Sequence, residues 1–164
     1  MKPLNESLIS SEFLMASETY PVFDVRTPSE FEKGHIPGAV NLPLFNDEER
    51  AVVGTLYKQE SREAAVMKGL EIAGPKLAGL AAQARRMAVD NTVLLHCWRG
   101  GMRSESLAWV FRTAGLHASV LKGGYKAYRA HFREMLHSVD WKFVVLGGPT
   151  GCGKTDILKA LESS

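Results

Sequence analysis

A chain of 164 residues, of which 45% are hydrophobic, is long enough for one well-packed domain but too short for two full domains. No apolar run reaches the length of a membrane span, and residues 1–13 do not resemble a signal peptide, so we expect a cytoplasmic protein without membrane contact. The two cysteines, Cys97 and Cys152, form no Cys-x-x-Cys pair, which disfavours structural disulfides and zinc. Residues 1–70 sum to −4 and residues 71–164 to +6, which suits an anionic or nucleic-acid partner but is equally typical of scattered surface charge.

Strand-like and helix-like segments alternate along the chain. In chain order, the hydrophobic pattern predicts strands at 22–26 and 39–42, a helix at 77–87, a strand at 92–96, a helix from 104 to 114, a strand at 119–121, a helix at 125–137 and a strand at 141–146. Residues 45–74 are less periodic and indicate a helical excursion beside the sheet. This order predicts an α/β domain with a central, mostly parallel sheet flanked by helices over residues 1–138. In such sheets ligands bind beyond the carboxyl ends of the strands.

A cysteine lies between the predicted strand 92–96 and the predicted helix that begins at Ser104. Free N–H groups at a helix N-terminus and nearby arginines stabilise a thiolate and bind an oxyanion, so we predict that Cys97 is a catalytic nucleophile. The alternative is a buried cysteine that acts as a small hydrophobic residue. The predicted anion-binding loop consists of Trp98, Arg99, Gly100, Gly101, Met102 and Arg103.

A second motif follows the predicted strand 141–146. The run Gly148-Pro149-Thr150-Gly151-Cys152-Gly153-Lys154-Thr155 matches the Walker A pattern G-x-x-x-x-G-K-[ST], with a chance match as the alternative. It predicts phosphate binding by Gly148, Gly151, Gly153, Lys154 and Thr155, with Lys154 at phosphate oxygens and Thr155 at Mg²⁺. A complete P-loop domain needs on the order of 100 residues or more, so we expect 139–164 to be its truncated beginning. Nucleotide or diphosphate and Mg²⁺ would then bind only in the full-length protein, and no metal site is expected to be complete in this chain.

Several segments together resemble the rhodanese family, across roughly residues 20 to 130. The run Asp24-Val25-Arg26-Thr27-Pro28-Ser29-Glu30-Phe31-Glu32-Lys33-Gly34-His35-Ile36-Pro37-Gly38-Ala39-Val40-Asn41-Leu42-Pro43 is similar to that family's D-V-R…E-F…G-H-I-P-G-A-x-N-L-P signature. Leu121-Lys122-Gly123-Gly124-Tyr125 resembles its closing motif. By physical chemistry alone, Asp24, Arg26 and His35 have structural roles, because such groups are usually hydrogen-bonded scaffold.

The chain resembles more narrowly the N-terminal part of the tRNA 2-selenouridine synthase family, through residues 46–58, the cysteine loop and the P-loop that follows. The resemblance implies a transferase that replaces the sulfur of 2-thiouridine at the tRNA wobble position with selenium, through an S-geranylated intermediate. It implies tRNA as partner, selenophosphate (or a persulfide) as donor, geranyl diphosphate as second substrate, and no cofactor on the rhodanese domain. Cys97 falls on the family's essential cysteine and would carry the chalcogen.

Other functions remain open. His96-Cys97 followed after five residues by Arg103 also fits the His-Cys-x5-Arg signature of cysteine-based phosphatases, which can share the rhodanese fold. The loop carries no carboxylate that could serve as general acid, which disfavours this alternative. A general thiosulfate or persulfide sulfurtransferase is also compatible with the loop. A noncatalytic binding module would not need a cysteine in a cationic loop.

Overall fold

The computed structural model describes residues 4–140, 142 and 144–162, and the chain divides into two compact units. The first unit, Met1–Glu134, contains the sheet and most of the helices, and the second is Met135–Ser164. Helix α7 (Gly124–Ser138) begins in the first unit and ends in the second. No described helix is long and apolar enough to cross a membrane.

The described residues form a five-stranded sheet in the order β1-β5-β4-β2-β3, and every neighbouring pair is parallel. This confirms the predicted α/β class. The middle strand, β4, is buried along its whole length, so the residue that follows it lies at the centre of the carboxyl edge of the sheet. The strands are β1 (Ser7–Leu8), β2 (Val22–Asp24), β3 (Val40–Asn41), β4 (Thr92–His96) and β5 (His117–Leu121).

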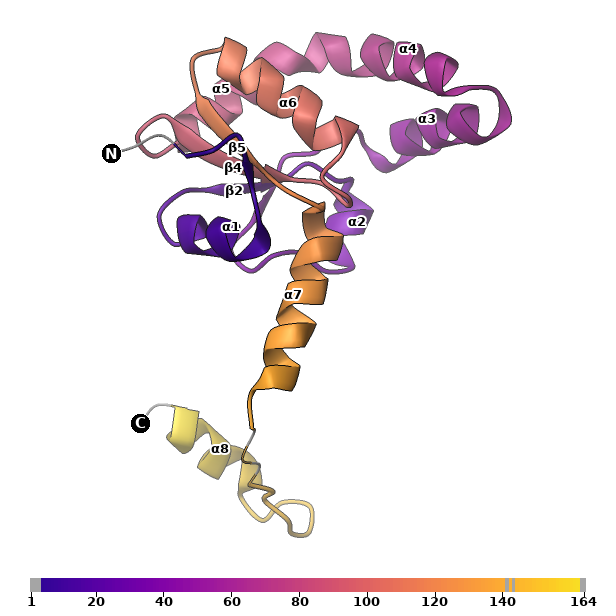
Figure 1. Cartoon of the computed structure of the whole chain (residues 1–164). Coiled ribbons are helices and arrows are strands. Elements are labelled where there is room, and N and C mark those ends of the chain that lie inside the picture. The colour runs from indigo at the N-terminus through magenta and orange to yellow at the C-terminus, as the bar shows by residue number, and fades with distance from the viewer. Residues whose placement is uncertain (1–3, 141, 143, 163–164) are drawn as a thin grey trace. The chain divides into compact units, whose positions relative to one another are not determined.

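Helices cover both faces of the sheet. Figure 1 shows α5 and α6 over one face and α1 over the other, with the α3–α4 hairpin extending beyond the sheet. Side chains of β4 alternate between two cores, because Leu95 packs on the α5–α6 side and Leu94 on the α1 side. The helices of the first unit are α1 (Ser10–Ser17), α2 (Pro28–Glu32), α3 (Asp47–Gln59), α4 (Arg62–Ala73), a 3-10 turn (Gly74–Lys76), α5 (Leu77–Met87) and α6 (Met102–Thr113).

Most predicted elements are present, with shifted ends. The helix expected from Ser104 begins two residues earlier, because Gly101 in extended conformation serves as its N-cap. The less periodic residues 45–74 form α3 and α4, whereas β1, α1 and α2 were not predicted. The strand expected at 141–146 is wrong for Lys142 and residues 144–146, which are not in a strand. The described residues of the second unit offer no strand to pair with them, and Trp141 and Phe143 lie outside the described residues.

Candidate active site

The cysteine loop connects β4 to α6 and is hydrogen-bonded to the beginning of α7. Cys97 is buried, and its carbonyl oxygen accepts a hydrogen bond of 2.9 Å from the Tyr125 N–H. The next carbonyl, of Trp98, accepts one of 3.0 Å from the Lys126 N–H. The first turn of α7 therefore holds the loop in place at the carboxyl edge of the sheet.

Two glycines allow this close approach. Gly100 and Gly124 have φ values of +64° and +59°, in the left-handed region. A Cβ atom on Gly100 would lie 2.6 Å from the Leu121 carbonyl oxygen, and one on Gly124 would overlap the Cys97 carbonyl oxygen. Glycine is therefore required at both positions, because the backbone of the cysteine loop packs directly on the backbone of the Leu121–Tyr125 motif.

The thiol of Cys97 is surrounded by neutral hydrogen-bond donors. The Ser104 hydroxyl lies 3.2 Å from Sγ, and the Gly101 N–H donates to Sγ over 3.3 Å. Burial is the largest single influence on the pKa of this thiol and raises it, but hydrogen bonds from Ser104, Gly101 and the Arg99 N–H outweigh it. The net effect lowers the pKa of Cys97 below its ordinary value, in the direction that the sequence predicts. The hydroxyl of Ser104 contributes to this effect and was not among the predicted site residues.

The two arginines of the loop have different surroundings. Arg99 is exposed and reaches the thiol through its backbone N–H rather than its charge. Arg103 instead forms a bidentate ion pair with Glu30 on α2, with nitrogen–oxygen distances of 2.6 and 3.2 Å. Burial raises the pKa of Glu30, but the hydrogen bond and charge of Arg103 outweigh it and lower that pKa. The prediction that Arg103 belongs to an anion-binding loop did not include this carboxylate, which lies 73 residues away in the chain.

Glu30 was not predicted as a site residue. Its local pattern indicates only a helix start, because its carboxylate accepts a hydrogen bond from the Thr27 N–H in the capping box of α2. No signal in the sequence connects it to the cysteine loop.

Beneath the loop lies a buried ion pair. The Arg26 guanidinium contacts Asp24 at 2.5 Å, donates to the Gly34 carbonyl oxygen at 2.8 Å, and lies 4.2 Å from the centre of the Tyr125 ring. Both charged side chains are almost fully buried, so the pair fixes the turn after β2. Asp24 and Arg26 are thus scaffold, in line with the structural role that physical chemistry alone assigns them.

Neither His35 of the rhodanese signature nor His96 of the His-Cys-x5-Arg pattern is placed to transfer a proton at the Cys97 thiol. Burial, the largest cause, and the nearby Arg26 charge lower the pKa of His96 to about 4 despite the attraction of Asp24. His96 is therefore neutral near pH 7, and neither of its ring nitrogens has a hydrogen-bond partner in the described part of the chain. His35 is exposed, stacks on Phe31 and shares a hydrogen bond of 3.0 Å with the Phe31 carbonyl oxygen through Nδ1.

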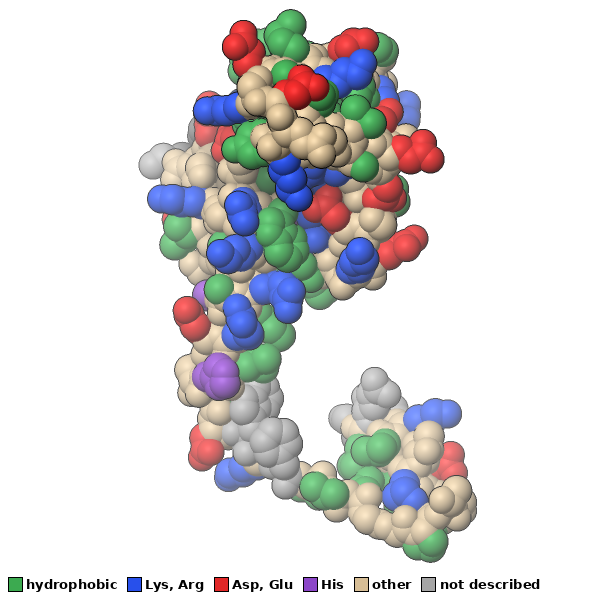
Figure 2. Space-filling model, turned by 90° about the vertical axis from the view of Figure 1, so that its right-hand side faces the viewer, with side chains coloured by type: hydrophobic (Ala, Val, Ile, Leu, Met, Phe, Trp, Pro, Cys, Tyr) green, Lys and Arg blue, Asp and Glu red, His purple; other side chains and the backbone are tan. Residues whose placement is uncertain are grey.

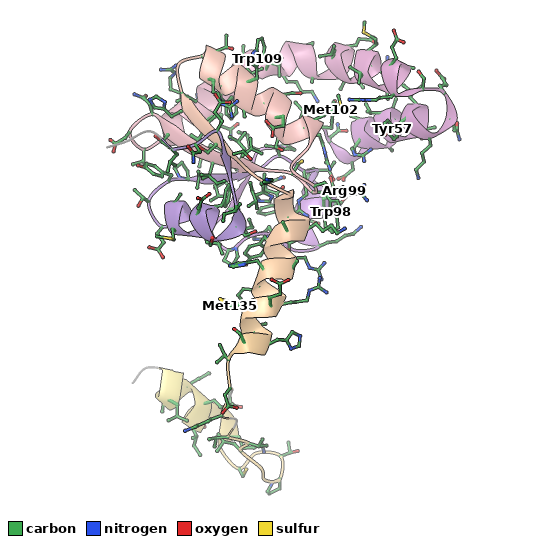
Figure 3. All side chains as sticks on the ribbon, viewed as in Figure 1. Tyr57, Trp98, Arg99, Met102, Trp109 and Met135 are labelled. Atoms are coloured by element: carbon green, nitrogen blue, oxygen red, sulfur yellow. The ribbon has the colours of Figure 1, made fainter. Side chains whose placement is uncertain are left out.

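The remaining loop residues lie at the surface beside the thiol. Figure 3 shows Trp98 and Arg99 close to the beginning of α7, and Met102 at the beginning of α6. Trp98 is half-buried with its ring centre 5.9 Å from that of Tyr125, and Met102 is 50% exposed. The structure thus collects the predicted loop residues around one buried thiol.

The Walker A residues lie in the second unit, where helix α8 (Lys154–Glu162) follows the glycine loop. Gly148, Gly151 and Gly153 all have positive φ, and the Lys154 ammonium donates to the carbonyl oxygens of Gly148 (2.9 Å) and Pro149 (2.7 Å). Residues 151–156 line a cavity of about 230 Å³. A lysine and a helix N-terminus beside a glycine loop are features of phosphate sites, and phosphate binding by these residues stays a prediction.

Among the residues that the structure describes, no group of three or more His, Cys, Asp or Glu side chains could hold a metal ion.

Comparison with known proteins gives the family. Residues 11–131 match the rhodanese-like domain. Proteins named tRNA 2-selenouridine synthase from Bordetella petrii and Bdellovibrio bacteriovorus are 44% and 43% identical over 88% of this chain. The chain spans only 40% and 39% of the length of these two relatives.

A solved structure extends the comparison. The N-terminal domain of a candidate ATP/GTP binding protein from Clostridium difficile 630 is 35% identical and superimposes with a TM-score of 0.70, over 77% of this chain and 98% of that domain. Part of Bacillus anthracis CoADR-RHD, 17% of that chain, shares the fold over 79% of this chain, at 21% identity and a TM-score of 0.50. The family match covers strands β2 to β5, the cysteine loop and the start of α7, and the chain belongs to the rhodanese family.

Proposed function

We propose that this chain is the rhodanese part of a tRNA 2-selenouridine synthase, a transferase in which Cys97 carries the chalcogen. The observation that supports it most directly is the buried thiol whose pKa is lowered by Ser104 and by the N–H groups of its own loop. The names of the relatives at 43–44% identity support the same reaction. The sulfur of 2-thiouridine at the tRNA wobble position would be replaced by selenium, through an S-geranylated intermediate.

The loop suits transfer of a sulfur or selenium atom. With thiosulfate as the simplest donor, the Cys97 thiolate attacks the outer sulfur, the sulfur–sulfur bond breaks, and sulfite leaves with the bonding electron pair. Cys97 then carries a persulfide whose terminal sulfur is anionic. The N–H groups of Arg99 and Gly101, which already face the thiol, are the donors that stabilise such an anion.

Further partners follow from the proposal. The substrates would be tRNA, selenophosphate or a persulfide donor, and geranyl diphosphate. In the full-length protein, Lys154 and the glycine loop before it would hold a diphosphate or nucleotide, and Thr155 would contact the accompanying Mg²⁺, which neutralises phosphate charge. Because tRNA is the substrate, we place the reaction in the cytoplasm.

Intact-mass measurement after incubation with a donor tests the proposal. Thiosulfate should add one sulfur atom to the wild type and to Cys152→Ser, but not to Cys97→Ser. A phosphotyrosine analogue should be left intact by all three proteins. Turnover of that analogue without any chalcogen adduct would replace the transferase by a phosphatase, and an adduct on Cys97→Ser would remove Cys97 from its role.

A further inference from the structure

An aromatic row leads away from the cysteine loop along α7. Ring centres are 5.9 Å apart for Trp98 and Tyr125, 5.8 Å for Tyr125 and Tyr128, and 6.1 Å for Tyr128 and Phe132. Along α7 the exposure of the rings increases, because Tyr125 is buried, Tyr128 is half-buried and Phe132 is 41% exposed. The row begins at the residue next to Cys97 and ends in solvent.

A row of positive charges runs beside it on the same helix. Lys126, Arg129 and Arg133 each follow one residue after an aromatic residue of α7, with the same spacing of three and four that keeps residues on one helix face. All three are exposed, and the ion pairs among the described residues involve none of them. Figure 2 shows Lys and Arg side chains beside hydrophobic ones along this part of the chain.

Aromatic rings next to unpaired cations are the combination that binds single-stranded nucleic acid, because bases stack on the rings while the cations contact phosphates. A purely apolar partner would gain nothing from the three cations. Burial, followed by the proximity of Tyr125, raises the pKa of Tyr128, so its hydroxyl adds no negative charge against phosphates. From Tyr125 to Phe132 the helix rises about 10 Å, room for roughly two or three stacked bases.

We propose that the aromatic and basic face of α7 binds unpaired nucleotides of the tRNA anticodon loop and leads the target base toward Cys97. The proposed surface consists of Trp98 of the cysteine loop and of five residues on α7, namely Tyr128, Phe132, Lys126, Arg129 and Arg133. The inference rests on the proposed tRNA substrate and adds the surface and the mode of contact, namely stacking of unpaired bases.

Fluorescence anisotropy with the 164-residue chain and a labelled anticodon stem-loop RNA tests the stacking. Phe132→Ala should weaken binding of the stem-loop about tenfold, and binding of a fully paired RNA of equal length much less. Tyr57 on α3 and Trp109 on α6 are matched controls, because they are 62% and 65% exposed and lie away from Trp98 (Figure 3). Tyr57→Ala and Trp109→Ala should leave the affinity unchanged.

The charges are tested through the salt dependence of binding. Arg129→Gln and Arg133→Gln should each reduce the slope of log affinity against log salt by about 0.7, because each removes one phosphate contact to a single strand. Arg86→Gln, an exposed arginine near the end of α5, is the control and should leave the slope unchanged.

Unchanged RNA affinity in Phe132→Ala together with unchanged salt slopes would overturn the inference. A second copy of the chain is the competing occupant of this face, and light scattering that shows a dimer broken by Phe132→Ala without loss of RNA affinity would assign the face to self-association. Chalcogen loading of the wild type separates the two proposals. If Cys97 takes up sulfur but Phe132→Ala leaves RNA affinity unchanged, the proposed α7 surface is rejected and the transferase is not. If Phe132→Ala weakens RNA binding but Cys97 takes up no sulfur, the transferase is rejected and the surface is not.

Discussion

The hydroxyl of Ser104 should control the reactivity of Cys97. It lies 3.2 Å from Sγ and 3.1 Å from the Gly101 carbonyl oxygen, belongs to the first turn of α6 and is fully buried. We therefore expect Ser104→Ala to raise the pKa of the Cys97 thiol. The substitution removes one oxygen atom and leaves the backbone of the loop in place.

The size of the effect follows from the hydrogen bond that is lost. A hydrogen bond to a charged acceptor contributes about 1.5 kcal/mol at the low end of its range. That free energy corresponds to about a tenfold change in the ionisation equilibrium, so the midpoint of thiolate formation should move upward by about one pH unit. Below the wild-type midpoint, the rate of alkylation should fall by about the same factor.

Iodoacetamide alkylation as a function of pH measures this midpoint. A Cys152→Ala background is needed, because Cys152 is exposed and would react as well. Ser119→Ala is the matched control, since Ser119 is equally buried and donates a hydrogen bond of 2.7 Å to the Asn5 carbonyl oxygen, away from the thiol. If Ser104→Ala and Ser119→Ala give the same midpoint as the parent protein, the thiolate is not stabilised by this hydroxyl.

Three further outcomes are expected. Arg103→Lys should reduce the rate of sulfur transfer from thiosulfate to cyanide far more than Arg99→Lys, because lysine cannot form the two parallel hydrogen bonds to the carboxylate partner; equal losses would contradict this. Gly124→Ala should lower the free energy of unfolding in urea by about 2 kcal/mol or more, whereas Gly79→Ala on the exposed side of α5 should raise it by about 1 kcal/mol, and the opposite order would refute the packing argument. His96 has a pKa of about 4 in the folded protein against an ordinary value of 6.5, so between these values the unfolded chain binds a proton that the folded protein does not. The free energy of unfolding should therefore be at its full value above pH 6.5 and fall by about 3 kcal/mol as pH falls toward 4. Urea unfolding of His96→Phe should therefore lose less stability than the wild type over that interval, and parallel curves would show that the histidine does not titrate as expected.

The sequence predicts the parts of the fold that have long, regular patterns. β4 is recognised because a strand buried on both faces is a continuous run of apolar residues, and α5 is found with its observed bounds. β1 and α2 have two and five residues, which is too short for a hydrophobic period to be visible. The strand expected at 141–146 follows from an apolar run whose pairing depends on neighbours that the described second unit does not contain.

The site is predictable where its chemistry is local in the chain. Cys97 and Gly100 can be assigned to the site from sequence, because a nucleophile between a strand and a helix needs a tight loop. The residues of that loop follow one another in the chain. The partner of Arg103 cannot be assigned, because Glu30 on α2 and Arg103 on α6 are 73 positions apart in the chain and only the folded structure brings their side chains together. The role of Ser104 depends on the exact start of α6, which a periodic pattern fixes only to within a few residues.

The electrostatics of the loop favour chalcogen transfer over phosphate ester hydrolysis. A cysteine phosphatase uses its loop arginine to bind two oxygens of a phosphate, and it needs a carboxylic acid to protonate the leaving group. Here Arg103 already holds both oxygens of Glu30, and the hydrogen bond and charge of Arg103 lower the pKa of that carboxyl, so Glu30 is poorly suited to donate a proton. Breaking this pair to bind a phosphate would leave the Glu30 carboxylate, whose side chain is only 29% exposed, without its cation. A persulfide or selenosulfide places only one negative atom among N–H groups that are already in position, so it does not require Arg103 to give up Glu30.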